Sequence, residues 1–197
     1  MTQVVLIRPG ATPYDEQNRV QGVLDLPLSD RGKAEVLALA GRLAVEKDLD
    51  PTALYCGPGE SVGRTAEAVG RALGVRPKRI DELRNIDQGL WQGLQIEEIK
   101  RRNLKVFRQW QDDPLTVCPP QGEPVDDALE RVKAVLRPLI RRHRDETIAL
   151  VVCEPLAQII AGYLRRIDRV RLDDDVPTGG FERIDIASDL GRNSEGG

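Results

Sequence analysis

The residues best suited to chemistry lie where three apolar runs of the sequence give way to loops. They are Arg8, Cys56, and the adjacent Cys153 and Glu154. Short, continuous apolar runs are typical of strands in a parallel sheet, and the ligands of such sheets bind beyond the carboxyl ends of the strands. An arginine in this place binds an anion, whereas a carboxylate or a thiol takes part in proton transfer or nucleophilic attack. We therefore expect these loops to build one site.

The histidine content limits this chemistry further. His143 is the single histidine of the chain, which excludes every mechanism that needs two, including most histidine-rich zinc sites. It precedes the apolar run 148–153, and a strand of that length spans about 20 Å. We expect His143 to lie near the amino end of this strand, away from the site, as a solvated residue at a helix end.

The composition excludes several classes of partner. The 197 residues carry a formal net charge of −3, which argues against nucleic acid or an anionic membrane as the main partner. No apolar run approaches the ~18 residues that span a bilayer, and the first residues lack the features of a secretory signal. Three cysteines, which include Cys118, do not suggest a disulfide framework, so we expect a cytoplasmic protein.

The elements that must position the site alternate between apolar runs and helical periodicity. Ser29 is a good N-cap for a helix that begins at the next residue, and Gly74 is a good C-terminal residue for the helix before it. Pro138 predicts a kink in a later helix. We expect strands over 4–8, 53–56, 79–80, 148–153 and 181–186, and helices over 30–45, 60–73, 95–111, 126–142 and 155–165. This alternation predicts an α/β fold with a mostly parallel sheet.

Two motifs carry a resemblance to a known family. Residues 19–32, RVQGVLDLPLSDRG, match every fixed position of the pattern Arg-x-Gln-Gly-x-x-Asp-x-Pro-Leu-Ser-x-x-Gly. Residues 8–12, RPGAT, are similar to Arg-His-Gly-Glu-Thr. Further matches fall at Tyr55, Pro58, Thr65, Ala66, Glu67, Leu83, Gly89, Trp91, Gly93, Asp127 and Arg131. From about residue 4 to residue 165, the chain resembles the histidine phosphatase superfamily.

The resemblance implies both an architecture and a reaction. The architecture is the phosphoglycerate mutase-like three-layer sandwich, with one domain over 1–189, a cap-like insertion over 95–118 and a flexible tail over 190–197. In the reaction, a histidine after the first strand attacks phosphorus, and two arginines and a second histidine hold the phosphoryl oxygens. A glutamate or aspartate protonates the leaving oxygen. The family needs no metal or cofactor, and homodimers are common in it.

Four of the five family-site positions are changed in this chain, and only Arg8 is retained. Pro9 takes the place of the attacking histidine, and its saturated ring has no lone pair with which to attack. Ser61 takes the place of the second arginine and Asn85 that of the proton donor. Glu154 takes the place of the second histidine. The sequence therefore predicts that the family reaction does not run here.

The altered pocket suggests a different use of the same positions. Arg8 and Glu154 correspond to positions that both face the phosphate in the family, so we expect an ion pair that fills the old phosphate site. The alternative places Glu154 in solvent. Arg64, one helical turn beyond Ser61, is a candidate replacement for the missing arginine. The candidate ligand-binding residues are thus Arg8, Gln21, Arg64 and Glu154.

Three functions stay open at this stage. The first is an inactive family member, a pseudoenzyme, that binds a protein partner or a small molecule. The second is a weak or repurposed phosphatase or phosphoryl-transfer enzyme that uses Arg8, Glu154, Cys153 or Asp87. The third is a metabolite sensor that keeps the pocket. Cys56 and Cys153 end strands that are neighbours in the family fold, and they are either a redox pair or small buried side chains.

Overall fold

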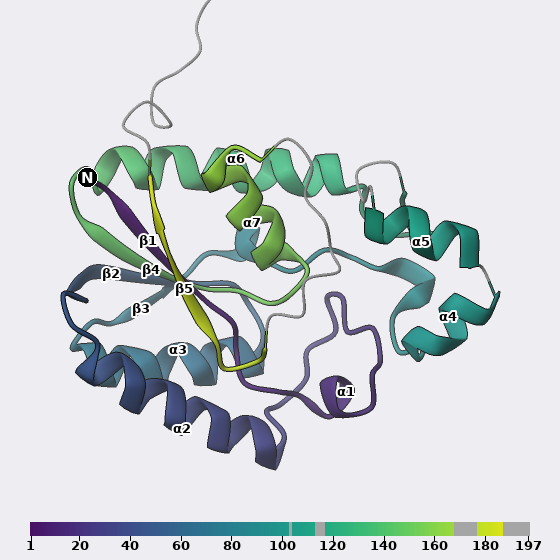
Figure 1. Ribbon diagram of the computed structural model, residues 1–197, viewed down its shortest axis with the longest axis horizontal. Coiled ribbons are helices and arrows are strands. Elements are labelled where there is room, and N and C mark those ends of the chain that lie inside the picture. Colours follow the sequence, from purple (N-terminus) through teal and green to yellow (C-terminus); the bar gives the residue numbers. More distant parts are fainter. Residues whose placement is uncertain (103, 113–116, 168–176, 187–197) are drawn as a thin grey trace, which may run out of the picture.

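The computed structural model describes residues 1–102, 104–112, 117–167 and 177–186 (Figure 1). Its sheet has five strands in the order β3-β2-β4-β1-β5. They are β1 (Gln3–Ile7), β2 (Pro51–Cys56), β3 (Pro77–Arg79), β4 (Thr147–Val151) and β5 (Phe181–Asp185). The pairs β1–β4, β2–β4 and β2–β3 are parallel, and β5 pairs antiparallel with β1. The predicted α/β fold with a mostly parallel sheet is confirmed.

Helices cover both faces of the sheet (Figure 1). α2 (Asp30–Val45) and α3 (Glu60–Leu73) lie on one face, and α6 (Val125–Arg142) and α7 (Leu156–Arg165) lie on the other. The smaller elements are α1 (Pro13–Glu16), the 3-10 helices η1 (Asp81–Leu83) and η2 (Gly89–Trp91), α4 (Ile96–Arg102) and α5 (Leu104–Asp112). Among the described residues, no helix is both long enough and apolar enough to cross a membrane.

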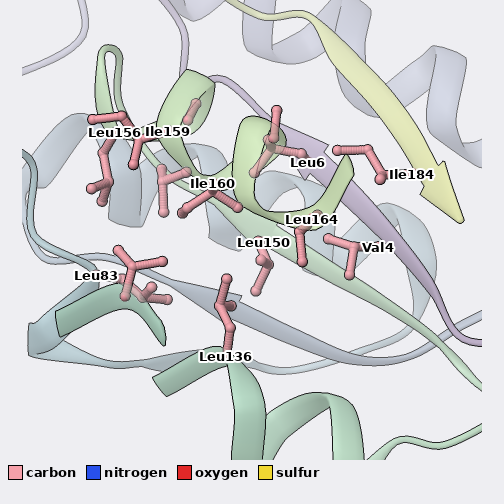
Figure 2. Close-up of a cluster of buried hydrophobic side chains, with 14 of the residues drawn as sticks. Val4, Leu6, Leu83, Leu136, Leu150, Leu156, Ile159, Ile160, Leu164 and Ile184 are labelled. Carbon is pink, nitrogen blue, oxygen red and sulfur yellow. The ribbon is translucent and has the colours of Figure 1, made fainter. Parts of the chain in front are cut away.

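The two faces of the sheet carry two separate cores because successive strand residues point to opposite sides. On the face of α6 and α7, Val4 and Leu6 of β1 and Leu150 of β4 belong to one cluster with Leu136 and Leu164 (Figure 2). All five are at most 2% exposed. Each such side chain stabilises the fold by about 1.5–3 kcal/mol on burial. The strands are therefore fixed from both sides, and the loops at their carboxyl ends start from rigid positions.

Local signals set the helix boundaries on the other face. The hydroxyl of Ser29 accepts a hydrogen bond from the Gly32 amide at 3.1 Å, as expected for an N-cap. Gly74 ends α3 with a left-handed backbone at φ 70°. Both helices have the expected bounds. Pro138 lies inside α6.

The expected insertion forms a cap with a core of its own. It consists of α4 and α5, and Ile99 and Phe107 pack there with Trp91 and Val117 in a cluster separate from the two sheet cores. A single polar helix over 95–111 was expected, whereas the structure has two. The expected tail over 190–197 lies outside the described residues.

The expectation for His143 is wrong in one respect. It lies at the C-cap of α6, among residues at the amino ends of β1 and β2, so it is remote from the strand loops as expected. It is buried rather than solvated, at 9% exposure. Its ring nitrogens are 2.8 Å from the Tyr55 hydroxyl and 2.6 Å from a Glu146 carboxylate oxygen. These two partners, which come from β2 and from the turn before β4, enclose the ring.

Candidate functional site

A cavity of about 820 Å³ lies beyond the carboxyl ends of β1 and β4. Its floor includes Arg8 and Pro9 from the loop after β1, and Cys153 and Glu154 from the loop after β4. The cap supplies an aromatic wall. That wall includes Phe107 and Trp110 from α5, and Trp91 of η2 lies beside them. All three strand-end loops were expected to build the site, and the structure brings residues of two of them to this cavity. Cys56, from the third, is buried in the core under α2 and α3.

The ion pair expected between Arg8 and Glu154 is present. Arg8 Nε donates to Glu154 Oε1 at 2.8 Å, and the arginine side chain is only 2% exposed. A second carboxylate also contacts the guanidinium, because Glu182 Oε1 lies 2.5 Å from Arg8 Nη1. Glu182 in turn pairs with Arg165 at the end of α7. The single retained arginine is therefore engaged by two carboxylates.

The pKa values of these two carboxylates, Glu154 and Glu182, are shifted in opposite directions. Burial raises the pKa of Glu154, and the charge and hydrogen bond of Arg8 offset only part of this effect. Burial also acts to raise the pKa of Glu182, but Arg8 and Arg165 outweigh it and hold that pKa below its ordinary value. Glu182 is therefore the more readily ionised of the two carboxylates that contact Arg8.

Pro9, which the resemblance aligns with the attacking histidine of the family, lines the cavity. Its backbone is fixed by the Gly179 amide, which donates to the Pro9 carbonyl at 2.9 Å. The next amide, of Gly10, donates to the Thr65 hydroxyl at 3.2 Å. The loop is thus rigid, and it presents no side-chain nucleophile at this point.

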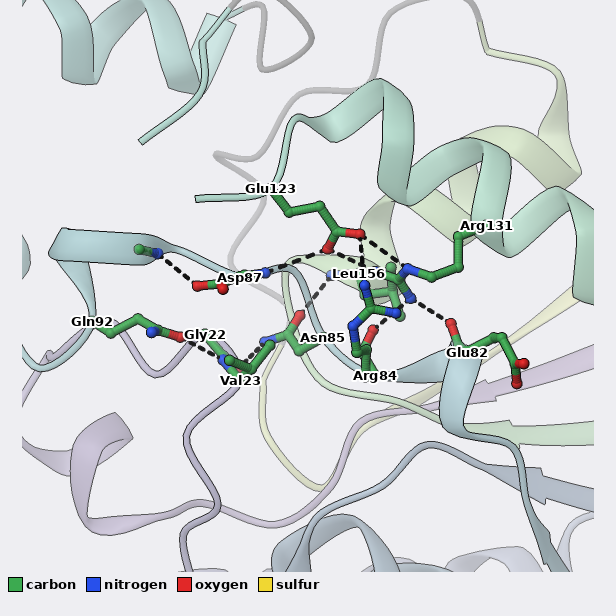
Figure 3. A network of polar contacts seen from close by, with 11 residues as sticks. Gly22, Val23, Glu82, Arg84, Asn85, Asp87, Gln92, Glu123, Arg131 and Leu156 are labelled. Carbon is green, nitrogen blue, oxygen red and sulfur yellow. Dashed lines mark hydrogen bonds and ion pairs between the residues drawn. The ribbon is translucent and has the colours of Figure 1, made fainter. Parts of the chain in front are cut away.

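Asn85, in the position of the proton donor, has a structural role (Figure 3). Its amide nitrogen donates to the carbonyls of Gly22 at 3.0 Å and Glu154 at 2.8 Å, and its oxygen accepts from the Leu156 amide at 3.4 Å. The side chain is buried. Asn85 therefore joins the loop after β4 to the loop around Gly22, and it has no acidic proton to deliver.

The other candidate ligand-binding residues lie in different surroundings. Ser61 is buried near the start of α3 and lines the cavity. Arg64 does not replace the missing arginine there: its side chain is 64% exposed, and it pairs with Glu67 at 3.6 Å. Gln21 lines the cavity, accepts from the Thr12 hydroxyl at 3.1 Å and donates to a backbone carbonyl.

The cysteines are free thiols. Cys153 lines the cavity, but burial, with the charges of Asp15 and Glu154, raises the pKa of its thiol to about 12. Burial also raises the pKa of Cys56. Because the thiolate is the nucleophile, a thiol held in its protonated form is inert in substitution chemistry.

Comparison with known proteins places this site in a family. Residues 4–192 match the family described as the histidine phosphatase superfamily (branch 1). The chain belongs to the histidine phosphatase superfamily. The expected membership is thereby confirmed over nearly the whole chain.

Two curated relatives show how this superfamily member compares in sequence. Phosphoserine phosphatase 1 of Hydrogenobacter thermophilus is 31% identical over 151 residues, which are 77% of this chain and 70% of that protein. Bifunctional protein Rv2228c of Mycobacterium tuberculosis is 32% identical over 190 residues, which are 95% of this chain and 49% of that protein. The chain thus spans about half the length of the mycobacterial relative.

Solved structures share the fold of this superfamily member. Bacillus stearothermophilus YhfR matches with a TM-score of 0.81 at 24% identity, over 95% of this chain and 93% of that one. A mycobacterial glucosyl-3-phosphoglycerate phosphatase, Rv2419c in complex with VO3, matches with a TM-score of 0.83 at 22% identity, over 93% and 97%. The expected phosphoglycerate mutase-like architecture is therefore confirmed.

Three residues of this histidine phosphatase-like site were missed by the sequence analysis. Glu182 reaches Arg8 because β5 pairs antiparallel with β1, with Glu182 opposite Leu6. Asp15 lines the cavity from α1, and Gln88 lines it from the residue before η2. The sequence predicted a strand around 181–186, but it did not show which residues of that strand lie opposite those of β1.

Proposed function

We propose that this superfamily member is a ligand-binding protein whose pocket no longer supports the phosphohistidine reaction. The observation that carries the proposal is the position of Arg8 between Glu154 and Glu182. In the family pattern, this arginine and a histidine hold a phosphoryl group. Here the arginine's contacts are taken by carboxylates, and Pro9 offers no nucleophile. The pocket is retained and the chemistry is lost.

The energetics of phosphate binding support this proposal. A hydrogen bond to a charged group contributes about 1.5–3 kcal/mol. Relative to the family pattern, a phosphate in this cavity would lose such bonds at Pro9, Ser61 and Glu154. It would also meet the repulsion of the Glu154 carboxylate. We therefore expect the cavity to bind phosphate weakly or not at all.

The nature of the partner follows from the size of the cavity. A volume of about 820 Å³ lies within the roughly 300–1,000 Å³ that is typical of small-molecule pockets. We therefore favour a small-molecule ligand over a protein partner, in a cytoplasmic protein. A homodimer is compatible with this role.

A second candidate function is phosphatase activity by a repurposed mechanism, which the similarity to phosphoserine phosphatase 1 of Hydrogenobacter thermophilus favours. It requires a nucleophile other than histidine. Of the candidates from the sequence, the Cys153 thiol is held protonated. Asp87 Oδ1 accepts a hydrogen bond from the Gly89 amide at 2.8 Å, and Glu154 pairs with Arg8. Each of these groups is engaged in a way that opposes attack on phosphorus.

Steady-state turnover separates the two functions. The purified protein is assayed with 4-nitrophenyl phosphate and with a panel of phosphomonoesters that includes phosphoserine, beside an Arg8→Ala variant whose folding is checked by circular dichroism. We expect no turnover above the blank for either protein. Turnover by the wild-type protein that the variant loses would overturn the proposal in favour of the repurposed phosphatase.

A further inference from the structure

We propose that the cavity binds a ligand that carries an ammonium group, held at the carboxylates of Asp15 and Glu154 and at the amide oxygen of Gln88. This inference rests on the proposed function, because it takes the pocket as no longer occupied by phosphate. It also names the class of ligand, an organic amine, that the altered pocket suits.

The cations that line the cavity are already engaged. Arg8 contacts Glu154 and Glu182, and Arg31 Nε lies 3.0 Å from a carboxylate oxygen of Glu35. Their positive charges are compensated by neighbouring carboxylates. The cavity therefore offers little at these points to attract an anionic ligand.

Two further cations, on the side of the cap, are also held. Lys100 Nζ is 2.7 Å from Glu97 Oε1. Arg19 donates to the Gly93 carbonyl at 2.6 Å and to the Gln17 side-chain oxygen at 2.8 Å. Arg19 keeps its full charge, but its donors are directed to these protein oxygens. Because Arg19 would repel a ligand ammonium, we expect that group to lie nearer to the loops after β1 and β4 than to Arg19.

Asp15 is the acidic counterpart that remains uncompensated. It lines the same cavity, and its Oδ2 accepts from the amide of Thr12 at 2.6 Å and from the hydroxyl of Thr12 at 2.7 Å. Within the described part of the chain, its side chain pairs with no cation. Asp15, from α1, and Glu154, from the loop after β4, both line this cavity.

Gln88 gives the second, independent indication of a ligand. Its side chain is 2% exposed and lines the cavity. Its Oε1 is buried and, among the described residues, accepts no hydrogen bond. A buried acceptor without a donor destabilises a protein by about 1–3 kcal/mol. A ligand that brings N–H donors removes this penalty, and an ammonium group has three donors and no acceptor.

The cap indicates what the ammonium is attached to. The rings of Trp91 and Trp110 meet edge to face at 5.9 Å, and Phe107 lies 6.1 Å from Trp110. Lys100 Nζ already lies 5.3 Å from the centre of the Phe107 ring. Aromatic walls suit an apolar or aromatic body and tolerate a nearby cation. The Trp110 indole N–H is also buried without an acceptor among the described residues, so it suits a body with a hydroxyl group.

Three probes that differ only in their head group test the inference. Tyramine, tyrosol and 3-(4-hydroxyphenyl)propionate share a hydroxyphenyl ring and carry an ammonium, a hydroxyl or a carboxylate. Binding of each to the wild-type protein is measured by isothermal titration calorimetry. We expect tyramine to bind at least about tenfold more tightly than either of the others. The inference would be overturned if tyrosol or 3-(4-hydroxyphenyl)propionate bound as tightly as tyramine or more tightly. It would also be overturned if tyramine did not bind at concentrations up to about 10 mM.

A matched pair of variants tests the location. Asp15→Asn removes the cavity charge, whereas Asp126→Asn removes a charge from an exposed position on α6. We expect the first to lower tyramine affinity about tenfold and the second to leave it unchanged. Equal effects of the two variants would overturn the assignment to this cavity. Phosphomonoester turnover, measured separately, would overturn the proposed function, whereas a failed tyramine preference without turnover would overturn this inference alone.

Discussion

Arg8 and Glu154 form a buried ion pair, with the arginine Nε 2.8 Å from the glutamate Oε1. The two residues come from loops after β1 and β4, which are adjacent parallel strands. In the family pattern both positions face a phosphoryl group. We infer from the resemblance that the pair stands where the family binds its phosphoryl group. Loss of the pair should therefore increase the affinity for phosphate.

Replacement of Glu154 tests whether it is this carboxylate that excludes anions. Glu154→Gln keeps the shape of the side chain and removes its negative charge. We expect inorganic phosphate to bind the variant about tenfold or more tightly than it binds the wild-type protein, because one repulsive charge is lost and Arg8 is partly freed. Titration calorimetry gives the affinity of the variant, which is compared with the limit of about 1 mM expected for the wild-type protein. The control is Glu130→Gln, at an exposed site on α6, and it should not increase the affinity for phosphate. An equal increase in both variants, or no increase in Glu154→Gln, would contradict this role of Glu154.

The pH dependence of stability distinguishes the two carboxylates on Arg8. The pKa of Glu182 is lowered in the folded protein, so its stabilising contribution is present above its unfolded pKa and is lost as the pH falls. The pKa of Glu154 is raised, so its contribution becomes less favourable as the pH rises through that range.

Thermal unfolding of Glu182→Gln and Glu154→Gln between about pH 4 and pH 7 measures this difference. We expect the wild-type advantage over Glu182→Gln to shrink as the pH falls. Relative to Glu154→Gln, the wild-type protein should instead become more stable as the pH falls. Parallel pH profiles of the two variants would refute the opposite roles assigned to these carboxylates.

Asn85 should stabilise the protein rather than serve in catalysis. Asn85→Ala leaves the buried carbonyl of Glu154 and the amide of Leu156 without a partner. We expect the free energy of unfolding to fall by about 1–3 kcal/mol in urea titrations. A loss below about 0.5 kcal/mol would show that the hydrogen bonds of Asn85 do not stabilise the fold. Asn85→Asp, which supplies an acid, should also destabilise the protein and should create no phosphatase activity.

The hydrogen bond between Tyr55 and His143 should matter for stability alone. Tyr55→Phe removes the hydroxyl that lies 2.8 Å from the imidazole. We expect a loss of about 1–2 kcal/mol in the free energy of unfolding. The control is Tyr163→Phe, whose hydroxyl accepts a longer, exposed bond of 3.4 Å from Arg137. Equal losses in the two variants, measured by urea titration, would contradict the role assigned to the buried histidine.

Much of the fold was predictable because its signals are local. The bounds of α2 and α3 follow from Ser29 and Gly74, whose capping geometry depends on neighbouring residues. The strands follow from short apolar runs. The burial of His143 was not predicted, because it depends on Tyr55, which is 88 residues away in the chain, and no periodicity in the surrounding helix indicates this contact.

The site was predictable only in part. The meeting of Arg8 and Glu154 followed from the resemblance, since both positions belong to family motifs. Glu182 did not, because its approach to Arg8 depends on the antiparallel register of β5. Asp15, on the short helix α1, and Gln88, next to the 3-10 helix η2, likewise reach the cavity because of local geometry that the sequence pattern does not specify. Long-range register and local geometry thus account for the residues that were missed.

Titration of inorganic phosphate into the wild-type protein tests the central claim most directly. The account predicts no measurable binding at concentrations up to about 1 mM, because Arg8 is engaged by two carboxylates and the other phosphate-binding positions are changed. Micromolar affinity for phosphate at the Arg8 site, abolished by Arg8→Ala, would contradict it.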